Sequence, residues 1–154
     1  EFLRSKDGDH NSYKSPDSIN ALNWADKERY IEIFNYYKDL ISLRKNHSAF
    51  RMKNPEDIIE NLDVYFYDNN DTSGVIIAHY KNNANEDLWK DIVVIYNGTT
   101  IDDYNVISSI PKSSNGFWNI VVKNGVVNQF GIERVSEDEI PKIKSHSMMI
   151  LYDE

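Results

Sequence analysis

The chain contains no cysteine, which excludes disulfide bonds and thiolate zinc sites. It also has no run of apolar residues long enough to cross a bilayer. Basic residues are scarce, since 17 Lys and Arg stand against 25 Asp and Glu and the formal net charge is −8. Because this negative field repels phosphate groups, we expect neither nucleic acid nor an anionic membrane to be a partner.

The 154 residues do contain enough apolar material for a core, because 40% of them are hydrophobic and 12% are aromatic. Such a chain can bury one full domain, together with a piece of another. The first residue is Glu1 rather than methionine, and it stands inside what reads as a sequence motif. We therefore expect the natural amino terminus to lie further upstream.

The first third of the chain changes from a loop pattern to a helical one. Residues 1–23 are polar and rich in turn formers, which predicts an extended loop. From about Asp26 the apolar side chains recur every three or four residues, at Tyr30, Ile33, Phe34, Tyr37, Leu40 and Ile41. This spacing predicts an amphipathic helix that ends near Lys45 or Asn46 and is capped by Asn23 or Asp26. Its apolar stripe needs a partner to pack against.

After residue 50 the apolar period falls to two, which indicates β-strands. We predict strands over 62–67, 74–80, 92–96, 117–122, 126–130 and 148–152. Turn-forming residues separate them at 68–71, 82–85, 97–98, 115–116 and 124–125. Asn124-Gly125 lies between two alternating runs and is the strongest hairpin signal. The pattern predicts a mainly β fold, an antiparallel β-sandwich, with residues 1–48 as the tail of an upstream domain and 49–154 as the sandwich.

Three phrases of the sequence carry a family resemblance. Glu1-Phe2-Leu3-Arg4, followed by Asn-Ser-Tyr-Lys-Ser-Pro-Asp-Ser-Ile-Asn at 11–20 and by Trp24, resembles the segment after the eighth barrel strand of type I pullulanases in the α-amylase superfamily. Residues 43–50, Leu-Arg-Lys-Asn-His-Ser-Ala-Phe, are similar to the end of the last barrel helix, with Ser48 where proline is usual. Residues 92–98 look like a strand and turn of the domain that follows the barrel.

The resemblance implies a role in hydrolysing α-1,6 branch linkages with retention of configuration. That reaction needs a nucleophilic carboxylate and a protonated carboxyl acid roughly 5 Å apart. In the family these residues lie on barrel strands that we expect upstream of Glu1, so the chain alone should have no catalytic residue and be inactive. Glu137, Asp138 and Glu139 read as a solvated charged loop rather than a catalytic pair. No cofactor is expected.

By the same resemblance, the loop at 1–23 faces the active site of the complete barrel. Amides, carboxylates and a ring suit a glucan, because they bond its hydroxyls and cover its apolar faces. The candidate sugar contacts are Asn11, Tyr13, Asp17 and Asn20, with Arg4 as an orienting residue. The alternative is that Asp17 and Asn20 only close a turn while Tyr13 packs on the barrel.

Three other apparent motifs give little evidence of function. Asp7, Asp9 and Asn11 begin like an EF-hand, but the required glycine and glutamate are replaced by Ser12 and Ser18. The four histidines, His10, His47, His79 and His146, lack the spacing of a zinc site and read as surface or core-edge residues, so no metal is predicted. The Asn-x-Ser/Thr triplets at Asn46, Asn70 and Asn97 occur by chance too often to carry weight.

Three functions compete at this point. The first is a non-catalytic part of a debranching hydrolase that supports the barrel, with α-glucan as the partner of the complete enzyme. The second is a stand-alone carbohydrate-binding sandwich, for which Trp89 is the freer stacking candidate because Trp118 lies inside an apolar strand and reads as core. The third is an interaction domain unrelated to sugars. We also expect the helix stripe either to fold back on the sandwich or to drive self-association.

Overall fold

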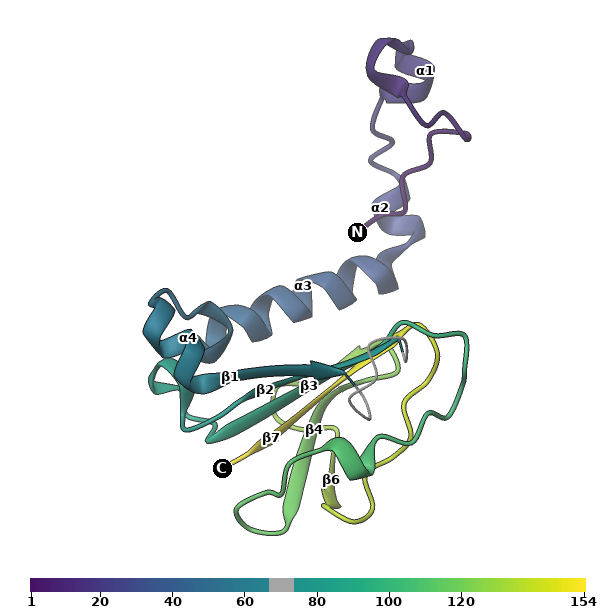
Figure 1. Cartoon of the computed structure of the whole chain (residues 1–154). Helices are drawn as coiled ribbons and strands as arrows, with labels where there is room; N and C mark the ends of the chain where they lie inside the picture. The colour runs from purple at the N-terminus through teal and green to yellow at the C-terminus, as the bar shows by residue number, and fades with distance from the viewer. Residues whose placement is uncertain (67–73) are drawn as a thin grey trace. The chain divides into compact units, whose positions relative to one another are not determined.

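The computed structural model describes residues 1–66 and 74–154, so the turn expected at 68–71, the last residue of the first predicted strand and the Asn70 triplet lie outside the described residues. The chain divides into two compact units, Glu1–Leu40 and Ile41–Glu154 (Figure 1). The division falls inside helix α3, which spans Ile31–Asn46. The functional boundary at residues 48 and 49 stays a prediction.

The amino-terminal unit contains a 3-10 helix at Ser12–Lys14 and three α-helical segments, the last of which continues into the larger unit. Helix α1 spans Asp17–Asn20, helix α2 spans Asp26–Arg29, and α3 follows after a break in which Tyr30 leaves the helical region with φ −114° and ψ 37°. The predicted helix is confirmed with this interruption. Asn23 accepts a hydrogen bond from the Ala25 amide at 3.2 Å just before α2, whereas Asp26 is the first residue of α2 and not its cap.

The larger unit begins with the last part of α3 and a 3-10 helix at Ser48–Arg51, and it then forms a short α-helix that the sequence analysis missed. Helix α4 spans Pro55–Asn61, and its start is well specified: Pro55 stands in the first turn and the Asn54 side chain accepts a hydrogen bond from the Glu56 amide at 3.2 Å. The helix lies directly before the first strand. The first predicted strand therefore still begins at Leu62.

An antiparallel sheet forms the body of this unit, as predicted. Its strands are β1 (Leu62–Phe66), β2 (Val75–Tyr80), β3 (Asp91–Asn97), β4 (Phe117–Lys123), β5 (Val126–Val127), β6 (Glu133–Ser136) and β7 (Ser147–Asp153). The order is β1-β2-β3-β7-β4-β5, with β6 also paired to β4 (Figure 1). The strand predicted over 126–130 ends at Val127 because a turn begins at Asn128, and the polar strand β6 was not predicted.

The core lies on one face of this sheet. Its buried members are Val75, Ile77, Val93, Ile95, Trp118, Ile120, Met149 and Leu151 from the strands, and Val106, Ile140 and Ile143 from the connections. The connections supply the second layer, and Tyr104 and Ile143 join them through two reciprocal amide–carbonyl hydrogen bonds of 2.9 and 3.0 Å. Trp118 is fully buried, which confirms its assignment to the core.

The hairpin predicted at Asn124-Gly125 is confirmed. It joins β4 to β5, and Lys123 lies opposite Val126 in the antiparallel register. Both turn residues have positive φ, 51° for Asn124 and 78° for Gly125. Asparagine and glycine tolerate this conformation best, and a two-residue turn of this kind matches the twist of the strands it connects.

Candidate functional site

All five candidate sugar-contact residues lie in the amino-terminal unit, where Asn20 has a structural role. Its amide nitrogen donates to the carbonyls of Ser12 and Ser15 at 2.7 and 2.8 Å, and its side-chain oxygen accepts from the Lys6 ammonium at 3.2 Å. The Arg4 guanidinium donates to the Asn20 carbonyl at 2.5 Å. Both atoms of the carboxamide therefore hold the loop together, which favours the turn-closing alternative for this residue.

Asn11, Tyr13 and Asp17 are exposed and remain accessible to a ligand. Tyr13 is 81% exposed, and no packing partner covers it within the described part of this unit apart from the Lys14 ammonium, 5.5 Å from the ring centroid. Asp9 stabilises the loop that carries these residues, because its carboxylate accepts hydrogen bonds from the Ser15 hydroxyl at 2.5 Å and the Asn11 amide at 2.9 Å. These two hydrogen bonds lower the pKa of Asp9 below its usual value. The sugar contacts themselves stay a prediction.

In the larger unit, a buried carboxylate fixes the segment that leaves helix α3. Asp87 is 4% exposed and accepts hydrogen bonds from the amides of Ala49 and Trp89, each at 3.0 Å. The His47 ring lies 3.0 Å from the same carboxylate, and the Ser48 hydroxyl lies 3.4 Å away. Burial alone would raise the pKa of Asp87, but the hydrogen bonds from Ala49, His47 and Trp89 lower it below its usual 3.8.

An aromatic stack lies beside this carboxylate. The centroid of the Trp89 ring lies 3.4 Å from that of the His47 ring and 4.0 Å from that of the Tyr152 ring. Both neighbouring rings are nearly parallel to Trp89. Trp89 is only 7% exposed, so the prediction that it could form a sugar-stacking platform is wrong. His47 is 9% exposed and lies at the edge of the core, one of the two positions expected for the histidines. We call Asp87, His47, Trp89 and Tyr152 the helix-exit junction.

The lowered pKa of Asp87 predicts an acid-sensitive fold. A carboxyl group whose pKa is lower in the folded than in the unfolded chain stabilises the fold above its unfolded pKa, and that stabilisation is lost as the pH falls. We therefore expect the free energy of unfolding to decrease as the pH is lowered through and below 3.8. Urea titrations at a series of pH values would show this. Asp87→Asn should flatten the decrease, and an equally steep decrease in that variant would contradict the assignment.

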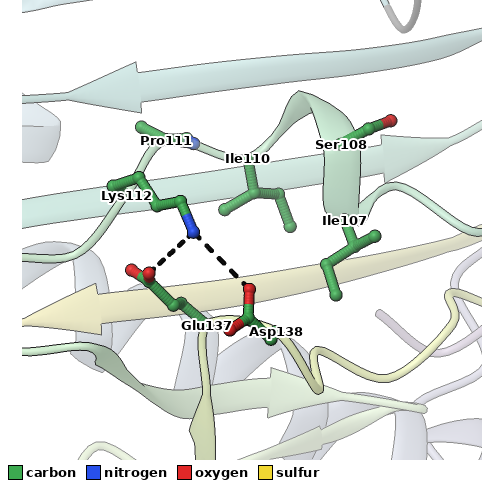
Figure 2. A pocket seen from close by; sticks show the side chains of 7 residues that line it. All are labelled: Ile107, Ser108, Ile110, Pro111, Lys112, Glu137 and Asp138. Atoms are coloured by element: carbon green, nitrogen blue, oxygen red, sulfur yellow. Dashed lines mark hydrogen bonds and ion pairs between the residues drawn. The ribbon is translucent and has the colours of Figure 1, made fainter.

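A surface pocket of about 410 Å³ lies between the two connections that cover the core (Figure 2). Figure 2 shows the Lys112 side chain directed at two carboxylates, with the Nζ–Oε1 distance to Glu137 at 2.7 Å and the Nζ–Oδ1 distance to Asp138 at 3.5 Å. Ile107, Ile110 and Pro111 form the apolar part of the lining. The sequence indicated the acidic cluster but not its partner Lys112, which lies in the connection between β3 and β4.

The charges of this pocket do not suit acid catalysis. The hydrogen bond from Lys112 is the main cause that lowers the pKa of Glu137, and the Ser113 amide, 3.2 Å from Oε2, adds to it. A general acid in retaining hydrolysis needs the opposite shift, because it must hold a proton near neutral pH. The pocket is therefore an ion-paired surface depression, as expected for a charged loop.

The described residues show neither a metal-binding cluster nor a membrane-spanning helix. Among residues 1–66 and 74–154, no group of three His, Asp or Glu side chains lies close enough together to hold a metal ion. In the same part of the chain, no helix has the length and apolar character needed to span a membrane.

The comparisons with known proteins agree on one family. Over 100 residues the chain is 41% identical to the pullulanase of Bacillus subtilis strain 168. This alignment covers 64% of this chain and 13% of that protein. Residues 63–125 match the family described as pullulanase, all-beta domain. Residues 63–125 of this chain are therefore similar to the all-beta domain of pullulanases. The resemblance to type I pullulanases expected from the sequence phrases is confirmed.

Solved structures extend the similarity beyond the pullulanase all-beta domain itself. The pullulanase of Bacillus acidopullulyticus matches 99% of this chain with a TM-score of 0.80 and 29% identity, over 17% of its own length. The type I pullulanase of Bacillus subtilis strain 168, solved with maltose, matches 99% with a TM-score of 0.75 and 27% identity, over 20% of its length. The chain thus spans about a fifth or less of the pullulanases it resembles.

Proposed function

We propose that this chain is the non-catalytic carboxy-terminal part of a pullulanase-type debranching enzyme, which hydrolyses α-1,6-glucosidic linkages in pullulan, starch or glycogen dextrins. Its work is to support the catalytic barrel. The helix-exit junction carries the proposal. Asp87 and Trp89 hold His47 and Ala49 in place, and these two residues come just after helix α3, whose end is similar in sequence to that of the last barrel helix of the family. A helix end fixed in this way couples the stability of the appended domain to the element before it.

The chemistry of the described residues supports a non-catalytic role. Retaining hydrolysis needs a carboxylate pair in which one member keeps its proton. The paired acidic residues of the pocket are instead bound to Lys112, which favours the ionised form of Glu137. Incubation of the chain with pullulan should therefore release no reducing sugar, whereas steady release that survives purification would overturn the proposal.

The sugar-contact part of the proposal concerns the exposed loop residues. In the complete enzyme, Asp17→Ala should raise the Michaelis constant for a branched dextrin about ten-fold, because losing a hydrogen bond to a charged group costs roughly 1.5 kcal/mol. Ser18→Ala, one residue further along the same exposed segment, is the matched control and should leave the constant unchanged. An unchanged constant in Asp17→Ala would remove that residue from the candidates.

A stand-alone carbohydrate-binding module is the alternative, and one observation favours it. Phe130 is 86% exposed on a turn in which the Asn128 side chain bonds both the Phe130 amide and the Gly131 carbonyl, at 3.1 and 2.8 Å. A ring held open in a rigid turn suits stacking on an apolar sugar face. Saturable binding of maltohexaose in calorimetry, abolished by Phe130→Ala, would support this alternative over a purely supporting role.

A further inference from the structure

The sequence contains three Asn-Gly pairs, and each has the atoms for an intramolecular reaction. The amide nitrogen of the glycine can attack the side-chain carbonyl carbon of the asparagine, forming a carbon–nitrogen bond and expelling ammonia to give a succinimide. Water then opens this ring at either carbonyl and leaves aspartate or isoaspartate. Glycine favours the attack because it has no Cβ to hinder it. The reaction requires a carboxamide that is free to move and a glycine amide that is not engaged.

The first pair, Asn97-Gly98, is held in place. Asn97 is 2% exposed, and its amide nitrogen donates to two backbone carbonyls at 3.1 and 2.9 Å. Its side-chain oxygen accepts from both the amide and the hydroxyl of Thr99, at 3.0 and 2.7 Å. The Gly98 amide, which would have to attack, donates to the Gly74 carbonyl at 2.9 Å. Both reacting groups are therefore engaged.

The second pair, Asn115-Gly116, has an exposed but restrained asparagine. The Asn115 amide nitrogen donates to the Asp153 carboxylate at 3.0 Å, and its side-chain oxygen accepts from the Phe117 amide at 3.0 Å. Both ends of the carboxamide are occupied. Attack on it would first break at least one of these bonds, which slows the reaction.

The third pair, Asn124-Gly125, differs from both of the others in its asparagine side chain. Asn124 is exposed at the tip of the hairpin between β4 and β5, and its side chain forms no hydrogen bond with the described part of the chain. A Cβ placed on Gly125 would meet no atom within 4 Å, and the same holds for Gly116, so the two turns differ in the restraint on the asparagine and not in crowding beside the glycine. Neither restraint seen at the other two pairs is present among the described residues.

We propose that Asn124 is a chemical modification site of this chain, converted through a succinimide to isoaspartate and aspartate with water as the only co-reactant. Each conversion releases one ammonia and adds one negative charge to a chain of formal charge −8. Isoaspartate also inserts an extra methylene into the main chain. Because the two-residue turn sets the register of Lys123 opposite Val126, the product perturbs the pairing of β5.

The test is incubation of the intact folded chain at mildly alkaline pH, with conversion at each pair followed by mass spectrometry. Electron-based fragmentation locates isoaspartate, and digestion at time zero corrects for conversion during work-up. We expect Asn124 to convert at least about ten-fold faster than Asn97 or Asn115, a factor that corresponds to a difference of about 1.4 kcal/mol in the barrier. Equal or faster conversion at either of the other two would overturn the proposal.

The same incubation in concentrated urea separates structure from local sequence. Unfolding removes the restraints on Asn97 and Asn115, so the three rates should approach one another. A ten-fold preference for Asn124 that persists in the unfolded chain would show that the fold is not its cause. Asn115→Gln is the control variant, which should leave the Asn124 rate unchanged, whereas Asn124→Gln should remove the rapid phase.

Discussion

Replacing Asp87 with alanine lowers the free energy of unfolding of the chain by about 3 to 5 kcal/mol, because removing this buried carboxylate leaves several hydrogen-bond donors without a partner. The side chain is completely buried, and it accepts hydrogen bonds from the backbone amides of Ala49 and Trp89. Leaving buried donors without an acceptor costs the full desolvation of each. The His47 ring loses its partner at the same time.

A urea titration followed by circular dichroism measures this change. Asp138→Ala is the matched control, since it also removes a carboxylate but from an exposed position, and its effect should stay within about 0.5 kcal/mol. Asp87→Asn should fall between the two, because the amide keeps one acceptor oxygen. An Asp87→Ala variant as stable as the Asp138→Ala variant would show that the helix-exit junction does not hold the fold.

Trp89→Ala should destabilise the chain by about 3 to 5 kcal/mol, the range typical of deleting a buried large aromatic side chain. The ring is stacked between His47 and Tyr152, so its loss opens a cavity between the helix exit and strand β7. Urea titration measures the effect. Phe130→Ala is the control, because that ring is exposed and its removal should cost less than about 0.5 kcal/mol.

The pair of variants also distinguishes packing from sugar binding. If Trp89 were a stacking platform, its loss would weaken glucan binding while stability stayed unchanged. Burial of the ring predicts the reverse. A stable Trp89→Ala chain would contradict the stacked geometry.

Periodic features of the fold were predictable from sequence because they depend on neighbours a few residues apart. Strand β3 is recognisable as a short apolar run that is buried on both faces, and Asn124-Gly125 specifies its turn by backbone preference alone. Helix α3 follows from its three- and four-residue spacing. Strand β6 escaped prediction because Glu133–Ser136 has too few apolar residues to alternate, and its pairing with β4 decides its structure.

The candidate site was harder to predict because its geometry depends on distant segments. Trp89 lies between Leu88 and Lys90, both exposed, so its neighbours in sequence suggested a surface ring. Its burial comes from His47 and Tyr152, at the two ends of the unit. In the amino-terminal loop, Asn20 fits equally well as a sugar ligand or a turn residue by type, and only its bonds to Lys6 and Ser12 favour the second role. For Asp87 the only local signal was its residue type, because an aspartate side chain commonly accepts a hydrogen bond from the amide two residues later, here that of Trp89.

Thermal inactivation of the complete debranching enzyme, carrying Asp87→Ala in this region, probes the supporting role. If the helix-exit junction supports the barrel, the variant loses activity faster on heating while its initial kcat and KM for pullulan at low temperature match those of the unmodified enzyme. An unchanged inactivation rate, or a fall in initial kcat without faster inactivation, would contradict a supporting, non-catalytic domain.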